Sequence, residues 1–150
     1  MSLFPKKDRR QQFINSLQKD YCDKLLLVKQ LHSQAETARY RCFKDRLLTL
    51  AYSEMKQTEI IKELLKNLDT AVPKETIAVR TEHAGNLFQA LNRDLEINRE
   101  DFWHYHERLH EAEAAGVAGM LQTLNQLREE ELEHRQILFY LLQRMNPYQI

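Results

Sequence analysis

The stretch LREEELEHRQIL, residues 127–138, is the part of the sequence that decides the predicted fold. Leu127 and Leu138 belong to an apolar series with spacings of three and four residues, which is typical of a helix with one buried face. Glu131 and His134 fall on that same face, between the apolar positions. The stretch therefore predicts a helix that carries a carboxylate and an imidazole into an apolar core.

Four apolar series of this kind follow one another along the chain, and they cover residues 14–31, 40–68, 88–109 and 117–145. Ser33 followed by Glu36 fits a capping box, so we expect the first helix to end near residue 32 and the second to begin at residue 33. Gly116 permits the turn after the third helix. The sequence predicts an all-α protein with four helices.

The second and fourth helices resemble each other in sequence. Glu54 and Glu131 are 77 positions apart, and so are Leu47 and Leu124. We interpret this as a duplicated helical hairpin, and two such hairpins make a four-helix bundle. About a dozen residues, from Asp69 on, separate the hairpins and reach about 40 Å when extended. This long connection leaves open whether the second and third helices are parallel or antiparallel.

The composition indicates one domain, residues 1–150, with residues 1–8 and 146–150 as flexible tails. The chain has 150 residues but only 3 Gly and 3 Pro, and it is rich in helix-favouring residues. Lys and Arg total 22, as do Asp and Glu, so no net charge attracts nucleic acid or an anionic membrane. The apolar runs are too short to span a bilayer, and we expect a cytoplasmic protein. Cys22 and Cys42 are too few for a disulfide framework.

A layer of polar residues crosses the predicted core. In a hairpin, residues at equal distances from the turn meet at the same height, so Tyr21 is expected to face Glu54 and Asn98 to face Glu131. Two buried carboxylates need a cation or several hydrogen-bond donors. The expected polar belt comprises Tyr21, Glu54, Gln57, Asn98, Glu131 and His134.

These residues resemble the metal centre of the ferritin-like superfamily, which includes bacterioferritins and rubrerythrins. In that family each hairpin gives one Glu and one Glu-x-x-His, which together hold two iron or manganese ions. The resemblance implies that Glu54, Glu131 and His134 are metal ligands. The other three ligand positions fall on Tyr21, Gln57 and Asn98. Three of six ligands remain, so the resemblance implies a degenerate di-metal site.

Three interpretations of the buried residues stay open. They form a hydrogen-bonded network without a metal, they hold a single iron or manganese ion, or they belong to a complete binuclear oxidase. The corresponding functions are a binding or structural module and, as an alternative, a mononuclear iron or manganese oxidase or oxygen-handling enzyme. A helical scaffold protein is a further alternative. The sequence identifies no catalytic residue, and it favours a role other than catalysis.

Helix three also carries an aromatic flank outside its buried face. His106 and His110 are four residues apart and could share a metal, although no third ligand is fixed by the spacing. We favour the other reading, in which this flank and Trp103 form a contact between subunits. The sequence therefore predicts a homodimer.

Overall fold

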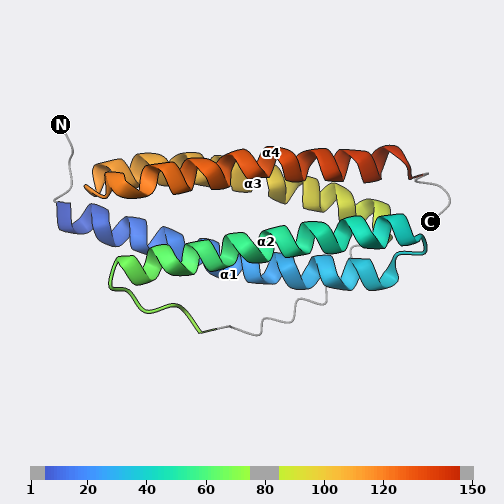
Figure 1. Cartoon of the computed structure of the whole chain (residues 1–150), viewed down its shortest axis with the longest axis horizontal. Helices are drawn as coiled ribbons and strands as arrows, with labels where there is room; N and C mark the ends of the chain where they lie inside the picture. The colour runs from blue at the N-terminus through green and yellow to red at the C-terminus, as the bar shows by residue number, and fades with distance from the viewer. Residues whose placement is uncertain (1–5, 75–84, 146–150) are drawn as a thin grey trace.

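The structure is a computed structural model that describes residues 6–74 and 85–145, and within these residues helices are the regular secondary structure, without strands. Four long helices lie side by side: α1 (Lys6–Thr37), α2 (Arg41–Asn67), α3 (Leu87–Ala114) and α4 (Leu121–Gln143) (Figure 1). A short 3₁₀ turn, Ala118–Met120, precedes α4. The predicted four-helix bundle is confirmed.

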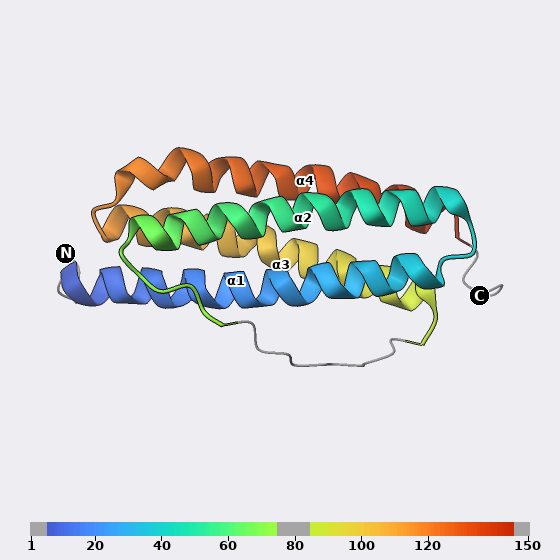
Figure 2. The same cartoon turned by 60° about the horizontal axis from the view of Figure 1, so that its bottom comes forward.

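The helices form two antiparallel hairpins, α1 with α2 and α3 with α4. Figure 2 shows that α2 and α3 run in the same direction, because α2 ends at one end of the bundle and α3 begins at the other. The two helix ends that the connection joins therefore lie at opposite ends of the bundle, a separation that its predicted reach permits. Residues 75–84 of this connection lie outside the described residues.

The predicted boundary between the first two helices is wrong. Ser33 and Glu36 lie inside α1, and α2 begins only at Arg41, after the extended residue Tyr40. The buried face of α1 continues through Ala35, which has no exposed surface, so the helix gains by running past the proposed cap. A capping box occurs instead at the start of α3, between Asn86 and Gln89.

The other helix ends follow the sequence more closely. Gly116, with φ of 75°, makes the turn after α3 that we predicted. At the chain start, residues 6–8 belong to α1 and not to a tail. Residues 1–5 and the predicted tail at 146–150 lie outside the described residues.

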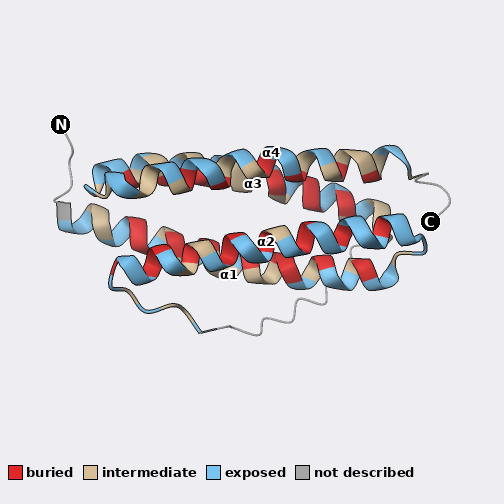
Figure 3. Ribbon diagram, in the orientation of Figure 1, coloured by how far each residue is buried: buried red, intermediate tan, exposed pale blue. Residues whose placement is uncertain are grey.

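Two apolar clusters fill the bundle, one on each side of a central polar layer. Buried residues line the inner surfaces of all four helices, as Figure 3 shows. One cluster is centred on Phe13, Leu17 and Leu127, and the other on Leu31, Leu47 and Leu138. The buried side chains between the clusters are polar or charged, and this is where the candidate site lies.

The buried face of α1 differs from the predicted one. Tyr21 and Leu25, which we placed on that face, are only half-buried. Asp20 and Lys24 are buried instead, at 6% and 3% exposure, in series with Leu27. The predicted face is confirmed at Ile14, Leu17, Val28 and Leu31. It differs in the middle of the helix, where the difference brings an ammonium group into the core.

Candidate metal centre

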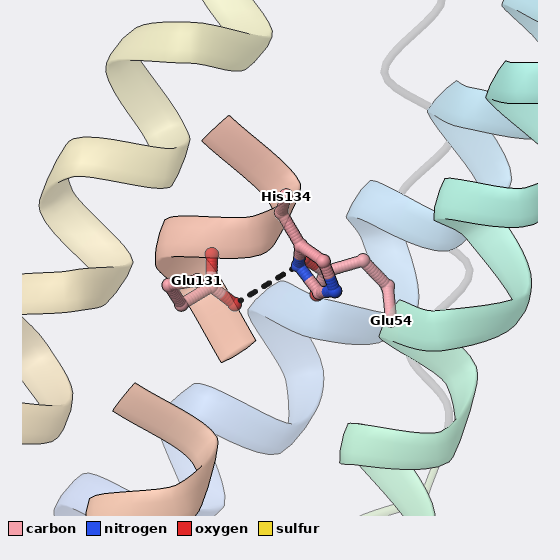
Figure 4. Close-up of side chains that lie close together, drawn as sticks. All are labelled: Glu54, Glu131 and His134. Atoms are coloured by element: carbon pink, nitrogen blue, oxygen red, sulfur yellow. Dashed lines mark hydrogen bonds and ion pairs between the residues drawn. The ribbon is translucent and has the colours of Figure 1, made fainter. Parts of the chain in front are cut away.

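Three potential ligands meet at the centre of the bundle. Glu54 projects from α2, and Glu131 and His134 project from successive turns of α4 (Figure 4). One ligand atom of each lies within 4.8 Å of the other two. All three side chains are almost completely buried, with at most 3% exposure. The group that the sequence identified is thus a candidate site for a metal ion.

A lysine from α1 also occupies this centre. The Nζ atom of Lys24 lies 2.6 Å from Oε2 of Glu54 and 2.7 Å from Oε1 of Glu131. It also lies 3.1 Å from Oδ2 of Asp101, on α3. Each helix therefore contributes at least one charged side chain to the centre, and three carboxylates surround one ammonium group.

The charges of these groups reinforce one another. Burial opposes the charge on Lys24, but Glu131 and Glu54 outweigh it and raise the pKa of Lys24 well above its usual value. Burial also opposes the charge on Glu131 and would raise its pKa, yet Lys24 and His134 lower that pKa to about 2. Burial disfavours protonated His134, but Glu131 and Glu54 raise its pKa to about 9. At neutral pH, Lys24 and His134 are cations.

Asp101 is the exception among the carboxyl groups. Its burial, together with the nearby Glu131 and Glu54, outweighs the attraction of Lys24 and raises the pKa of Asp101 to about 7. One ammonium group cannot favour three neighbouring carboxylates equally, and the most peripheral of them is the hardest to ionise. The central cluster therefore places two cations, Lys24 and His134, beside Glu54 and Glu131, with Asp101 only partly ionised at neutral pH.

Each polar side-chain atom of Glu54, Glu131 and His134 has a partner in the protein. Glu54 accepts from Nδ1 of His134 at 2.8 Å and from Lys24. Glu131 accepts from Lys24 and from Nδ2 of Asn98, at 2.8 Å. Nε2 of His134 lies 2.6 Å from the Ser53 hydroxyl. The centre is a closed network of hydrogen bonds.

This network does not fit a divalent metal while Lys24 is present. A metal ion would have to displace the ammonium group or the His134 contacts, because these already engage the facing carboxylate oxygens. It would also add two positive charges to a buried cluster that is already balanced. The donor atoms of Glu54, Glu131 and His134 suit a metal, but the cation beside them opposes it.

The remaining residues of the predicted belt occupy two places. Asn98 lies in the centre and donates to Glu131. Gln57 lies outside it, where it accepts a 2.9 Å hydrogen bond from the Tyr105 hydroxyl and donates to Glu130. Tyr21 is half-buried and packs against the apolar cluster around Phe13. We predicted that Tyr21 faces Glu54, and the side chains that bind this carboxylate are Lys24 and His134.

A second buried ion pair lies next to the centre. Arg108 of α3 makes two hydrogen bonds to Asp20 of α1, of 2.7 and 3.1 Å, and a third, of 2.9 Å, to Glu111. Asp20 and Arg108 are each only 6% exposed. This pair joins the two hairpins, and the sequence analysis did not identify it.

Asp94 of α3 is a buried acid without a cation bound to it among the described residues. Its Oδ1 accepts from Nε2 of Gln34 at 3.1 Å, while Oδ2 of Asp94 and the side-chain Oε1 of Gln34 lack hydrogen-bond partners within the described part of the chain. Burial raises the pKa of Asp94 from 3.8 to about 7. Neutral Asp94 therefore contributes to the stability of the fold. This contribution to the free energy of unfolding is complete below pH 3.8 and is lost as the pH rises through 7.

We therefore expect Asp94→Asn to stabilise the protein relative to the native chain as the pH rises. Between pH 5 and 8 the difference in unfolding free energy should shift by about 2–3 kcal/mol in favour of the variant, since only the native chain must ionise a buried group. Urea unfolding at both pH values measures this shift, with Asp45→Asn, at an exposed position, as the control. A difference that stays constant with pH would contradict the account.

The aromatic flank of α3 is on the surface. Trp103 is 59% exposed, and its ring packs edge-on against His106. The rings of His106 and His110 are 5.0 Å apart, but Nδ1 of His106 lies 2.9 Å from a guanidinium nitrogen of Arg128. An arginine in this position competes with a metal for His106. The flank is thus separate from the buried centre.

Comparison with known proteins identifies the fold. No protein-family model matches the chain, and no curated protein matches its sequence. Solved structures match closely: a Desulfovibrio desulfuricans bacterioferritin described with a diiron site has a TM-score of 0.81 at 17% identity, over 93% of this chain and 83% of that one.

Two further structures agree with this match. A ferritin-like diiron-carboxylate protein from Bacillus anthracis has a TM-score of 0.79 at 17% identity, with 95% of this chain and 99% of that one covered. Dps from Thermosynechococcus elongatus has a TM-score of 0.79 at 14% identity, with 97% of this chain and 98% of that one covered. The predicted resemblance to ferritin-like proteins is confirmed for the fold.

No helix among the described residues is both long enough and apolar enough to cross a bilayer.

Proposed function

We propose that this protein is a ferritin-like bundle with a degenerate metal centre, and that it acts as a binding or structural module in the cytoplasm. One observation carries the proposal: the polar side-chain atoms of Glu54, Glu131 and His134 are all engaged by groups of the protein itself. A centre of this kind stabilises the bundle without a metal. The donor atoms that a metal or its bound oxygen would need are occupied by these contacts.

The proposal predicts that the protein is isolated without bound iron or manganese. Protein purified without chelator should contain less than about 0.1 equivalent of either metal per chain, because the buried charges are already balanced. Elemental analysis measures the content, and aerobic addition of ferrous ion tests for turnover. About one equivalent of metal that Glu131→Ala removes would overturn the proposal.

The second candidate is a mononuclear iron or manganese enzyme. One observation favours it: one ligand atom each of Glu54, Glu131 and His134 lies within 4.8 Å of the other two. Two carboxylates and one imidazole form a ligand set that suits these metals. Under this alternative Lys24 would have to leave the centre, and ferrous ion would be oxidised in the aerobic assay.

The assembly state forms part of the first proposal. We propose a homodimer in which Trp103 is buried against the second copy. An exposed Trp with Phe102 and His106 packed against it gives the flank an apolar surface, and aromatic residues often anchor such contacts.

A further inference from the structure

Lys24 lies among the residues that could hold a metal ion. Its Nζ atom is held by Glu54, Glu131 and Asp101 at 2.6, 2.7 and 3.1 Å, and these acids come from three different helices. His134 lies against the same two glutamates, at 2.8 Å from Glu54 and 3.5 Å from Glu131. Carboxylate oxygens and an imidazole around one cation make up a metal coordination set, and here that cation is an ammonium group.

We infer that the Lys24 ammonium is the resident cation of this centre, and that it excludes a divalent transition metal from an otherwise competent site formed by Glu54, Glu131, His134 and Asp101. This inference rests on the proposed function and deepens it, because it identifies the single residue that keeps the centre free of metal. Nothing in the comparisons assigns a role to Lys24.

The charge of Lys24 supports this assignment. Its ammonium group lies 2.6 Å from Glu54 and 2.7 Å from Glu131, so it occupies carboxylate oxygens of both glutamates that a metal ion would need. A divalent ion beside it would meet a like charge at short range in the core, where little water screens the repulsion. Removing the Lys24 ammonium group removes this repulsion and frees both carboxylates.

Space for an ion is available beside the lysine. A cavity of about 10 Å³, close to the room that one water molecule needs, is lined by Lys24, Asp20, Asp101, His104 and Tyr105. Truncation of Lys24 to Ala would join its own volume to this cavity. A metal ion with a bound water could then approach the carboxylates that now face the ammonium group.

The test is a titration with Co²⁺, an air-stable divalent probe, of the native protein, Lys24→Ala and Lys24→Gln. We expect about one equivalent to bind to each variant, on the order of 100-fold more tightly than to the native chain, since one nearby positive charge has been removed. Equilibrium dialysis gives the affinity and stoichiometry. The increase in melting temperature with Co²⁺ shows binding to the folded state.

Matched variants separate this site from adventitious binding. Lys19→Ala, which removes an exposed lysine of the same helix, should behave like the native protein, and Lys24→Ala with Glu131→Gln should lose the gained affinity. Lys24→Gln keeps a polar side chain at this position, so the titration uses this variant if Lys24→Ala does not fold without metal. Folded variants that bind Co²⁺ no better than the native chain would overturn the inference and leave the proposed function intact. A native chain isolated with stoichiometric metal would overturn the proposed function itself.

Discussion

Replacing Lys24 by Met is expected to lower the free energy of unfolding by about 3–5 kcal/mol, because two buried carboxylates lose the cation between them. The Met side chain is unbranched and only one heavy atom shorter than that of Lys, so lost packing contributes little. Glu54 is 2% exposed and Glu131 has no exposed surface, so neither carboxylate can recover its hydration without opening the bundle. Urea unfolding in the presence of EDTA measures the loss and prevents a metal from replacing the ammonium group.

Two comparisons test whether charge is the cause. Lys19→Met should change stability by no more than about 1 kcal/mol, since the pair of Lys19 with Asp23 is exposed. Adding Glu54→Gln and Glu131→Gln to Lys24→Met should recover most of the loss, because the buried charges are then removed together. If Lys24→Met alone costs less than about 1 kcal/mol, the centre does not depend on this cation.

The fold could be predicted because its signal is repeated along the chain. Apolar residues at spacings of three and four mark every helix, and near-absence of Gly and Pro excludes most other structures. The long connection between Asp69 and Leu87 agreed with parallel α2 and α3 but did not require it. The start of α2 was misplaced because Ser33 and Glu36 fit a capping box, yet burial of Leu31 and Ala35 favours a longer α1.

The candidate site was only half predictable. Glu54, Glu131 and His134 were found because they interrupt apolar series that otherwise define a buried face. Lys24 and Asp101 were missed because charged residues are rarely buried, and apolar neighbours such as Leu25 offered an alternative face for the helix. Only packing against the other helices decides between faces that lie one position apart.

A signal for these residues was nevertheless present. In α1, the positions 17, 20, 24, 27 and 31 repeat with spacings of three and four, and they include Asp20 and Lys24. The corresponding series in α3 includes Asp101, Tyr105 and Arg108. Opposite charges placed on the inner faces of two helices in one bundle predict buried ion pairs, provided that both series are considered together.

The pair of Arg108 with Asp20 gives the second large expected effect. Arg108→Met should lower the free energy of unfolding by about 3–5 kcal/mol, because the Asp20 carboxylate then remains buried without its partner. The geometry favours a strong interaction, since the guanidinium group contacts both carboxylate oxygens, at 2.7 and 3.1 Å. Arg99→Met, at an exposed position of the same helix, should stay within about 0.5 kcal/mol of the native value.

A double-mutant cycle isolates the interaction itself. Asp20→Asn alone leaves the buried guanidinium group with two ionic partners, Glu111 at 2.9 Å and Glu107 at 3.7 Å, so this variant should lose less stability than Arg108→Met. The double variant should be more stable than the sum of the two single losses implies, with a coupling free energy of about 1–3 kcal/mol. Because Asp20 belongs to α1 and Arg108 to α3, the coupling measures how strongly one hairpin is held to the other. Strictly additive losses would mean that the two side chains stabilise their own helices independently, and that other contacts, such as the Lys24 ion pairs and the apolar clusters, hold the hairpins together.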